Sequence, residues 1–297
     1  MKKLFILILS LILLGCASGQ NPQETESVGL IEKTTKIESF EICYHEGGKG
    51  ETVLLLHGFG GVKEMWFEFA QFLIPSYRVI ILDLPGHGKS TKIIESSYTI
   101  EKQAERIEQF VNSLELSKFH IAGNSMGGTI SGEYAVNYPD RLLSLGLFDT
   151  GGVLSNEMSE FVSILMSEGK NILIAKNREE YDKVLEFVFF KIPSWSQERI
   201  DGSFEKSIAD PELKEKIFED ITSGYQIPLQ FNLNKINAPT LILWGDKDRV
   251  LDVSCANILE KGISNSKTVI MKDMGHCPQM ERPEETANHY IEFLRSI

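Results

Sequence analysis

The sequence predicts an α/β fold with a doubly wound, mostly parallel sheet and a helical insertion ahead of its last strands. Short runs of four to six apolar residues recur without polar alternation, as in strands that are buried on both faces. Stretches with helical periodicity separate these runs, and such alternation is typical of βαβ units. The alternation stops between about residues 151 and 233, where the sequence has only helical periodicity.

Six apolar runs predict the strands of the sheet, each buried on both faces. They are Val53–Leu56, Val79–Leu82, KFHIAG, LLSLGLFD, PTLILWGD and SKTVIMKD. Helical spacing predicts helices at Ile100–Leu114, Thr129–Tyr138 and Glu284–Ser296. The chain therefore divides into a first core part (28–150), the helical insertion (151–233) and a second core part (234–297).

The insertion is a candidate cap, because ligands bind at the carboxyl ends of the strands in such sheets. Its apolar residues either line a lipid pocket or form the cap's own core, and their helical spacing favours the core. They are Phe161, Ile164, Leu165, Phe187, Phe189, Phe190 and Trp195.

The N-terminus has the pattern of an export signal over residues 1–15. Lys2 and Lys3 precede an apolar run that is too short to span a bilayer comfortably. The run ends in LLGC, which resembles the lipobox of bacterial lipoproteins. That resemblance implies lipidation of Cys16, a polar tether over residues 16–27, and export to a membrane facing the periplasm or the cell surface. An uncleaved anchor helix and a plain secretory signal are the alternatives.

Composition excludes some function classes. The net charge of −12 argues against a nucleic-acid partner, because phosphate binding needs a basic surface. The sequence has no cofactor fingerprint, phosphate loop or metal cluster, so we predict neither a cofactor nor a metal. Cys43, Cys255 and Cys277 are expected to be buried free thiols, with a single disulfide as the alternative.

A G-x-S-x-G motif at residues 123–127 supplies the candidate nucleophile, Ser125. It follows a predicted strand and precedes a predicted helix, which is the setting of a nucleophile elbow. The glycines permit the sharp turn that strains the serine backbone. The alternative is a serine that only caps the following helix.

A serine hydroxyl needs a base and an acid that orients the base, in the chain order Ser, acid, His. His276 lies in a loop after the last predicted strand, whereas His289 falls inside the last helix, so we favour His276 as the base. Asp248 follows the strand before it and is the favoured acid. Asp246 and Asp149 are its rivals.

Two backbone N–H groups must face the oxyanion that develops during acyl transfer. Met126, directly after the serine, is expected to supply one. The turn HGFGG after the first buried strand supplies the other, for which we choose Phe59, while His57 is expected to be structural.

From about residue 51 to 294 the chain resembles the α/β-hydrolase superfamily, through HGFGG, DLPGHGKS, GNSMGG, GDKDRV and GHCPQMERPEE. Within it, GNSMGGTISGEYAVNYPDRLLSLGLFDTGG and GHCPQMERPEETANHYIEFL are similar to segments of monoacylglycerol-lipase-like enzymes and small bacterial lipases. The resemblance implies a serine ester hydrolase that cleaves acylglycerols or similar small acyl esters through an acyl-enzyme.

Two other functions stay open. The motif GNSMGG also occurs in serine C–C hydrolases of ring-fission products, but those enzymes typically carry tryptophan after the catalytic histidine, where this chain has Cys277. A catalytically inactive surface lipoprotein with the same fold is disfavoured by the complete Ser, Asp and His set.

Overall fold

The structure, a computed structural model, describes residues 29–155, 157–222 and 228–297. The predicted signal segment, Cys16 and the tether lie outside the described residues. Within them, no helix combines the length and the apolar character needed to cross a membrane.

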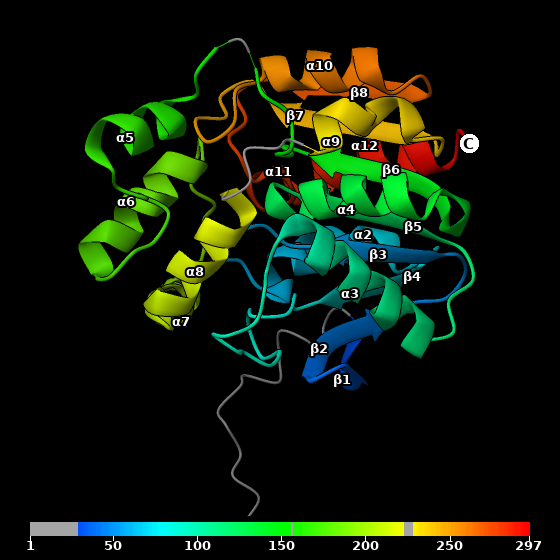
Figure 1. Ribbon diagram of the computed structural model, residues 1–297, viewed down its shortest axis with the longest axis horizontal. Helices are drawn as coiled ribbons and strands as arrows, with labels where there is room; N and C mark the ends of the chain where they lie inside the picture. The colour runs from blue at the N-terminus through cyan, green and yellow to red at the C-terminus, as the bar shows by residue number, and fades with distance from the viewer. Residues whose placement is uncertain (1–28, 156, 223–227) are drawn as a thin grey trace, which may run out of the picture.

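The sheet has eight strands in the order β1-β2-β4-β3-β5-β6-β7-β8 (Figure 1). The first two strands are antiparallel and the other six are parallel, which confirms the predicted fold class. The strands are β1 (Leu30–Ile37), β2 (Phe40–Gly47), β3 (Thr52–Leu56), β4 (Arg78–Leu82), β5 (Phe119–Asn124), β6 (Leu142–Phe148), β7 (Thr240–Gly245) and β8 (Ser266–Met271).

Helices cover both faces of this sheet. Alternate residues of β3 enter different apolar clusters: Leu54 and Leu56 pack with α3 and α4, while Val53 and Leu55 pack with α2 and α12. The core helices are η1 (Lys63–Trp66), α2 (Phe67–Leu73), α3 (Ile100–Ser113), α4 (Met126–Asn137), η2 (Pro139–Arg141), α9 (Pro228–Asn232), η3 (Leu233–Lys235), α10 (Ser254–Gly262), α11 (Pro278–Glu281) and α12 (Pro283–Leu294).

The register of the central strands brings several loop starts to one edge. Leu56 of β3 pairs with Gly123 of β5, and Asn124 pairs with Phe148 of β6. Phe148 in turn pairs with Leu243 of β7. Because these strands are parallel, the residues that follow them leave the sheet side by side.

Four helices form a separate group beside this carboxyl edge, as Figure 1 shows for α5 (Glu160–Glu168), α6 (Arg178–Val188), α7 (Gln197–Ile208) and α8 (Pro211–Thr222). Phe161 and Phe187 are buried in a small cluster with Val250, which follows β7, and Ile164 and Leu165 pack against it. Phe189 is buried with its ring 5.4 Å from that of Trp195, whereas Phe190 is 53% exposed. Most of these apolar side chains therefore form a core of the helical group, and Phe190 does not.

Two features of the sheet differ from the sequence prediction. The hairpin β1–β2 was not predicted, because β1 alternates little and most of its residues are exposed. We predicted that SKTVIMKD is buried on both faces, which is wrong: β8 is the last strand of the sheet, and Ile270 is 46% exposed. The three described cysteines are buried and unpaired, as expected.

A buried ion pair joins the loops after β3 and β4. The Lys63 ammonium lies 2.8 Å from Asp83 Oδ2, and neither side chain is exposed. Burial opposes the charged form of Lys63, but the adjacent Asp83 carboxylate outweighs it and raises the lysine pKa. Asp83 also accepts the backbone N–H groups of Lys63 and Lys89. This carboxylate therefore organises both loops.

Lys63→Met should lower the free energy of unfolding by about 3–5 kcal/mol, because Asp83 would be left as a buried, uncompensated charge. Urea unfolding measures the loss. Adding Asp83→Asn should recover part of it, since the amide oxygen still accepts an N–H while the charge is gone. Lys267→Met, in an exposed pair with Glu292, is the control and should cost at most about 1 kcal/mol. Equal losses for the two lysines would contradict this account.

Candidate active site

Ser125 lies at the turn between β5 and α4, with φ 57° and ψ −119°. Non-glycine residues rarely adopt this conformation, and such strain persists only where the surroundings enforce it. The Ser125 N–H donates to the carbonyl of Phe148 at 3.0 Å, which ties the turn to the end of β6. The serine is partly exposed, whereas its neighbours in the motif are buried.

The two motif glycines are required by close contacts across the turn. A Cβ at Gly123 would lie 2.2 Å from the backbone of Gly127. A Cβ at Gly127 would lie 2.4 Å from the carbonyl oxygen of Leu56, at the end of β3. Neither contact is sterically allowed, so α4 can start directly behind Ser125 only if both positions lack side chains.

His276 and Asp248 lie together at the same edge. His276 Nδ1 is 2.8 Å from Asp248 Oδ2, and both side chains are almost fully buried. The other Asp248 oxygen accepts the N–H groups of Val250 and Leu251, at 2.8 and 3.1 Å. The carboxylate is therefore held by its own loop and can orient the imidazole so that Nε2 is the free ring nitrogen.

The rival acids make different contacts from Asp248, although Asp149 lies close to it: one oxygen of each and a ring nitrogen of His276 are within 4.8 Å of one another. Asp246 is partly exposed and pairs with Lys247. Asp149 is fully buried and accepts the N–H of Gly245 at 2.8 Å. His289 lies inside α12 and not in either of these loops.

Asn124, which sequence reasoning did not single out, connects the serine turn to the histidine loop. Its buried amide donates to the carbonyl of His276 at 2.9 Å and to that of Phe148 at 3.2 Å. Its oxygen accepts from the Gln279 amide at 3.2 Å. A buried amide next to the serine was the available signal, since such groups need partners. The partners themselves could not be identified from the sequence, because they lie 24 to 155 residues away along the chain.

The turn that carries Phe59 is held by His57. The His57 Nε2 atom accepts the N–H of Leu84 at 3.0 Å, so its Nδ1 carries the proton and donates to the carbonyl of Gly58 at 2.8 Å. Complete burial lowers the pKa of His57 to about 4, which keeps the ring neutral. Its observed contacts are those of a structural residue.

Backbone donors are available on both sides of Ser125. The first backbone hydrogen bond of α4 runs from Thr129 to Ser125, so the N–H of Met126 has no acceptor within the helix. A Cβ at Gly58 would lie 3.2 Å from the Cβ of Ser125, which places the Phe59 turn beside the serine. The Phe59 ring also packs 5.5 Å from that of Phe218 on α8.

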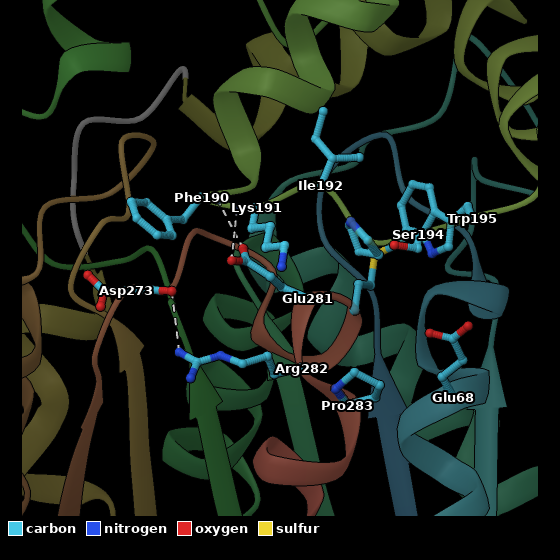
Figure 2. A pocket seen from close by; sticks show the side chains of 12 residues that line it. Glu68, Phe190, Lys191, Ile192, Ser194, Trp195, Asp273, Glu281, Arg282 and Pro283 are labelled. Atoms are coloured by element: carbon cyan, nitrogen blue, oxygen red, sulfur yellow. Dashed lines mark hydrogen bonds between the residues drawn. The ribbon is translucent and has the colours of Figure 1, made fainter.

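Glu281 joins the helical group to the histidine loop. Its carboxylate accepts the N–H groups of Phe190 and Lys191 at 3.0 Å and that of Gly275 at 3.1 Å. Residues 188–191, here called the cap strap, also accept the N–H of His276 at the Val188 carbonyl, at 2.8 Å. Figure 2 shows Glu281 directly below Phe190 and Lys191.

A pocket of about 490 Å³ lies beside the cap strap. Its walls include Phe190, Trp195, Glu281 and Arg282 (Figure 2), and its lining does not include Ser125, Asp248 or His276. We therefore do not take this pocket as the place where bonds are made and broken.

Glu281→Ala should lower kcat/KM by about ten- to a hundredfold, because a displaced histidine loop misaligns the reacting groups. It should also destabilise the fold by about 1.5–3 kcal/mol, since N–H groups lose a charged acceptor. Glu281→Gln keeps one acceptor oxygen and should be intermediate. Ester hydrolysis rates and thermal unfolding measure both effects.

Glu285→Ala is the matched control, because Glu285 pairs only with Arg282 on the exposed start of α12. It should change kcat/KM by no more than about twofold and the free energy of unfolding by no more than about 0.5 kcal/mol. If Glu281→Ala were as active as this control, the hydrogen bonds of Glu281 to the cap strap and to Gly275 would not be what positions His276.

The fold and this arrangement of side chains define an α/β hydrolase. The sequence pattern of the family described as alpha/beta hydrolase fold matches residues 51–283, and the chain belongs to that family.

Similar proteins cover nearly all of the chain. Monoacylglycerol lipase ABHD6 of Rattus norvegicus is 35% identical, over 91% of this chain and 84% of its own length. Lipase 1 of Psychrobacter immobilis is 33% identical, over 99% and 96% respectively. The solved structure of a bacterial membrane phospholipase A is 41% identical with a TM-score of 0.89, over 93% and 89%.

Proposed function

We propose that this chain hydrolyses acylglycerols or similar acyl esters, with Ser125 as nucleophile, His276 as general base and Asp248 as the orienting acid. The chain is a carboxylic ester hydrolase, as its lipase relatives are. The single observation that carries the residue assignment is the 2.8 Å bond between His276 and the buried Asp248, on the loops that border the strained Ser125 turn.

The reaction begins when Ser125 Oγ attacks the ester carbonyl and His276 Nε2 takes its proton. Asp248 stabilises the imidazolium that forms. The N–H groups of Phe59 and Met126 receive the developing oxyanion. The imidazolium then protonates the departing alcohol, which leaves an acyl-enzyme on Ser125. A water molecule, deprotonated by His276, attacks that ester and releases the acid.

The substrate class is supported by the relatives, two of which are named as lipases and one as a phospholipase A. All three names denote hydrolases of lipid esters, and the first specifies monoacylglycerol. Phe59, on the turn beside Ser125, packs 5.5 Å from Phe218 of α8, so apolar side chains of both the core and the helical group lie next to the place where an acyl chain would bind. We therefore expect the chain to favour acyl glycerides over acetyl esters.

Ser125→Ala should lower kcat by several powers of ten, about 10⁶ in the best-studied serine hydrolase, with the fold retained. The assay uses a panel of esters from acetyl to long acyl, including monoacylglycerols, with a ring-fission product as the test for C–C cleavage. A serine-directed phosphonate should label the native protein and not the variant. Labelling at another residue, or C–C cleavage without ester cleavage, would contradict the proposal.

We also propose that the chain is held at a membrane by a lipid on Cys16. Cleavage before Cys16 removes Lys2 and Lys3 and changes the net charge from −12 to −14, so electrostatic attraction to an anionic bilayer does not help. One acyl chain binds a bilayer only marginally, at about 10⁴ M⁻¹, so stable anchoring needs two or more. A short tether would then keep the catalytic domain near acylglycerols.

Full-length protein expressed in bacteria should sediment with membranes and carry the mass of an acylated N-terminus. Cys16→Ser should be recovered in the soluble fraction or as uncleaved precursor, because the lipid attachment atom is lost. Hydrolysis of a short soluble ester is the control and should be equal in both. A native chain that is soluble, unmodified and cleaved elsewhere would replace the lipoprotein with a plain secreted enzyme.

A further inference from the structure

Asp149 is a fully buried carboxyl group for which the mechanism above has no role. It follows Phe148 at the end of β6, and its backbone has a φ of 43°. The Asp149 N–H donates to the carbonyl of Leu243 on β7, at 2.9 Å. The side chain is thus directed along the edge of the sheet where Asp248 and His276 lie.

Only one of the two carboxyl oxygens of Asp149 accepts a hydrogen bond from the described residues. Its Oδ1 accepts the N–H of Gly245 at 2.8 Å, whereas its buried Oδ2 has no such partner among the described residues. One oxygen of Asp149, one of Asp248 and a ring nitrogen of His276 all lie within 4.8 Å of one another. Two buried carboxyl groups therefore face each other beside a single imidazole.

Two adjacent buried carboxyl groups do not both ionise readily, and their hydrogen bonds decide which one carries the proton. Asp248 accepts three N–H groups, from Val250, Leu251 and His276. Asp149 accepts only one. Burial, and then the charge of Asp248, raise the pKa of Asp149 well above its usual range.

We propose that Asp149 is a positioning residue that holds a proton on Oδ2 and donates it in a hydrogen bond to the carboxylate of Asp248. This inference rests on the proposed role of Asp248 as the orienting acid. The bond fixes the Asp248 carboxyl group from the side opposite its own loop. It also spreads the negative charge that Asp248 places beside His276.

The other titratable groups near Asp149 are consistent with a neutral acid. Glu281 adds negative charge from α11 and disfavours ionisation of Asp149. Cys277, in the histidine loop, is buried, and this burial raises the pKa of its thiol, so it is uncharged. Apart from His276, the titratable groups of the described residues that face Asp149 are therefore acidic or neutral.

Asp149→Asn and Asp149→Ala test the proposal through the pH profile of kcat/KM for a short soluble ester. The amide of Asn can accept from Gly245 and donate to Asp248, so Asn should keep kcat/KM within about threefold and leave the acid limb in place. Ala removes the donor. It should lower kcat about tenfold or more and shift the midpoint of the acid limb to higher pH.

The outcomes separate the alternatives. If Asp149 were ionised, both variants would remove a negative charge near the imidazolium, and the acid limb would shift to lower pH in both. A purely structural role would leave the acid limb in place in both variants, whatever the change in stability. If Asp149→Ala lost as much activity as Asp248→Asn, about 10⁴-fold, Asp149 would be the orienting acid itself. Each of these results overturns the proposal.

Three further measurements keep the test independent of folding and of the proposed function. Thermal unfolding identifies an Ala variant that does not fold, in which case the acid limb of Asp149→Asn alone decides between a neutral and an ionised Asp149. Asp140→Asn is the control and should behave as the native protein, because Asp140 is exposed on η2. Full activity of Ser125→Ala would instead refute the proposed function.

Discussion

Ser125, directly after β5, has a strained backbone conformation, and the structure around it stabilises that conformation. The strain persists because the N–H of Ser125 is bonded to Phe148 and because α4 starts immediately behind it. The helix fits there only because Gly123 and Gly127 bring no side chains to the contact. The turn therefore depends on the parallel register of β3, β5 and β6, which places all three strand ends at one level.

Buried polar side chains connect the Ser125 turn and the neighbouring loops through hydrogen bonds. Asn124 bonds the histidine loop, His57 bonds the loop after β4, and Asp83 holds that loop to the segment after β3. Each of these groups is buried in apolar surroundings, where an unpaired donor or acceptor costs about 1–3 kcal/mol. A displacement of one loop would therefore break hydrogen bonds of the next. The geometry of the proposed triad is thus held partly by residues outside it.

The helical group α5–α8 is connected to the same network. The cap strap bonds His276 through Val188, and Glu281 bonds both the strap and Gly275. Phe218 on α8 packs on Phe59 at the opposite side of the serine turn. The helical group thus shares hydrogen bonds and packing contacts with the loops that carry Ser125 and His276. Displacement of the cap strap would therefore also disturb His276.

Much of this protein was predictable from sequence alone. Continuous apolar runs identified the six parallel strands, because strands covered on both faces have no polar side. The glycines around Ser125 indicated the turn, and chain order selected Asp248 and His276. Local patterns could not identify the edge strand β1 or the exposure of β8, since a strand's position in the sheet is set by its partners. They also could not reveal Asn124, Glu281 or Asp149, which are ordinary polar residues in the sequence. Only the tertiary structure brings these side chains to His276 and Asp248, because the contacts join segments up to 152 residues apart and depend on burial.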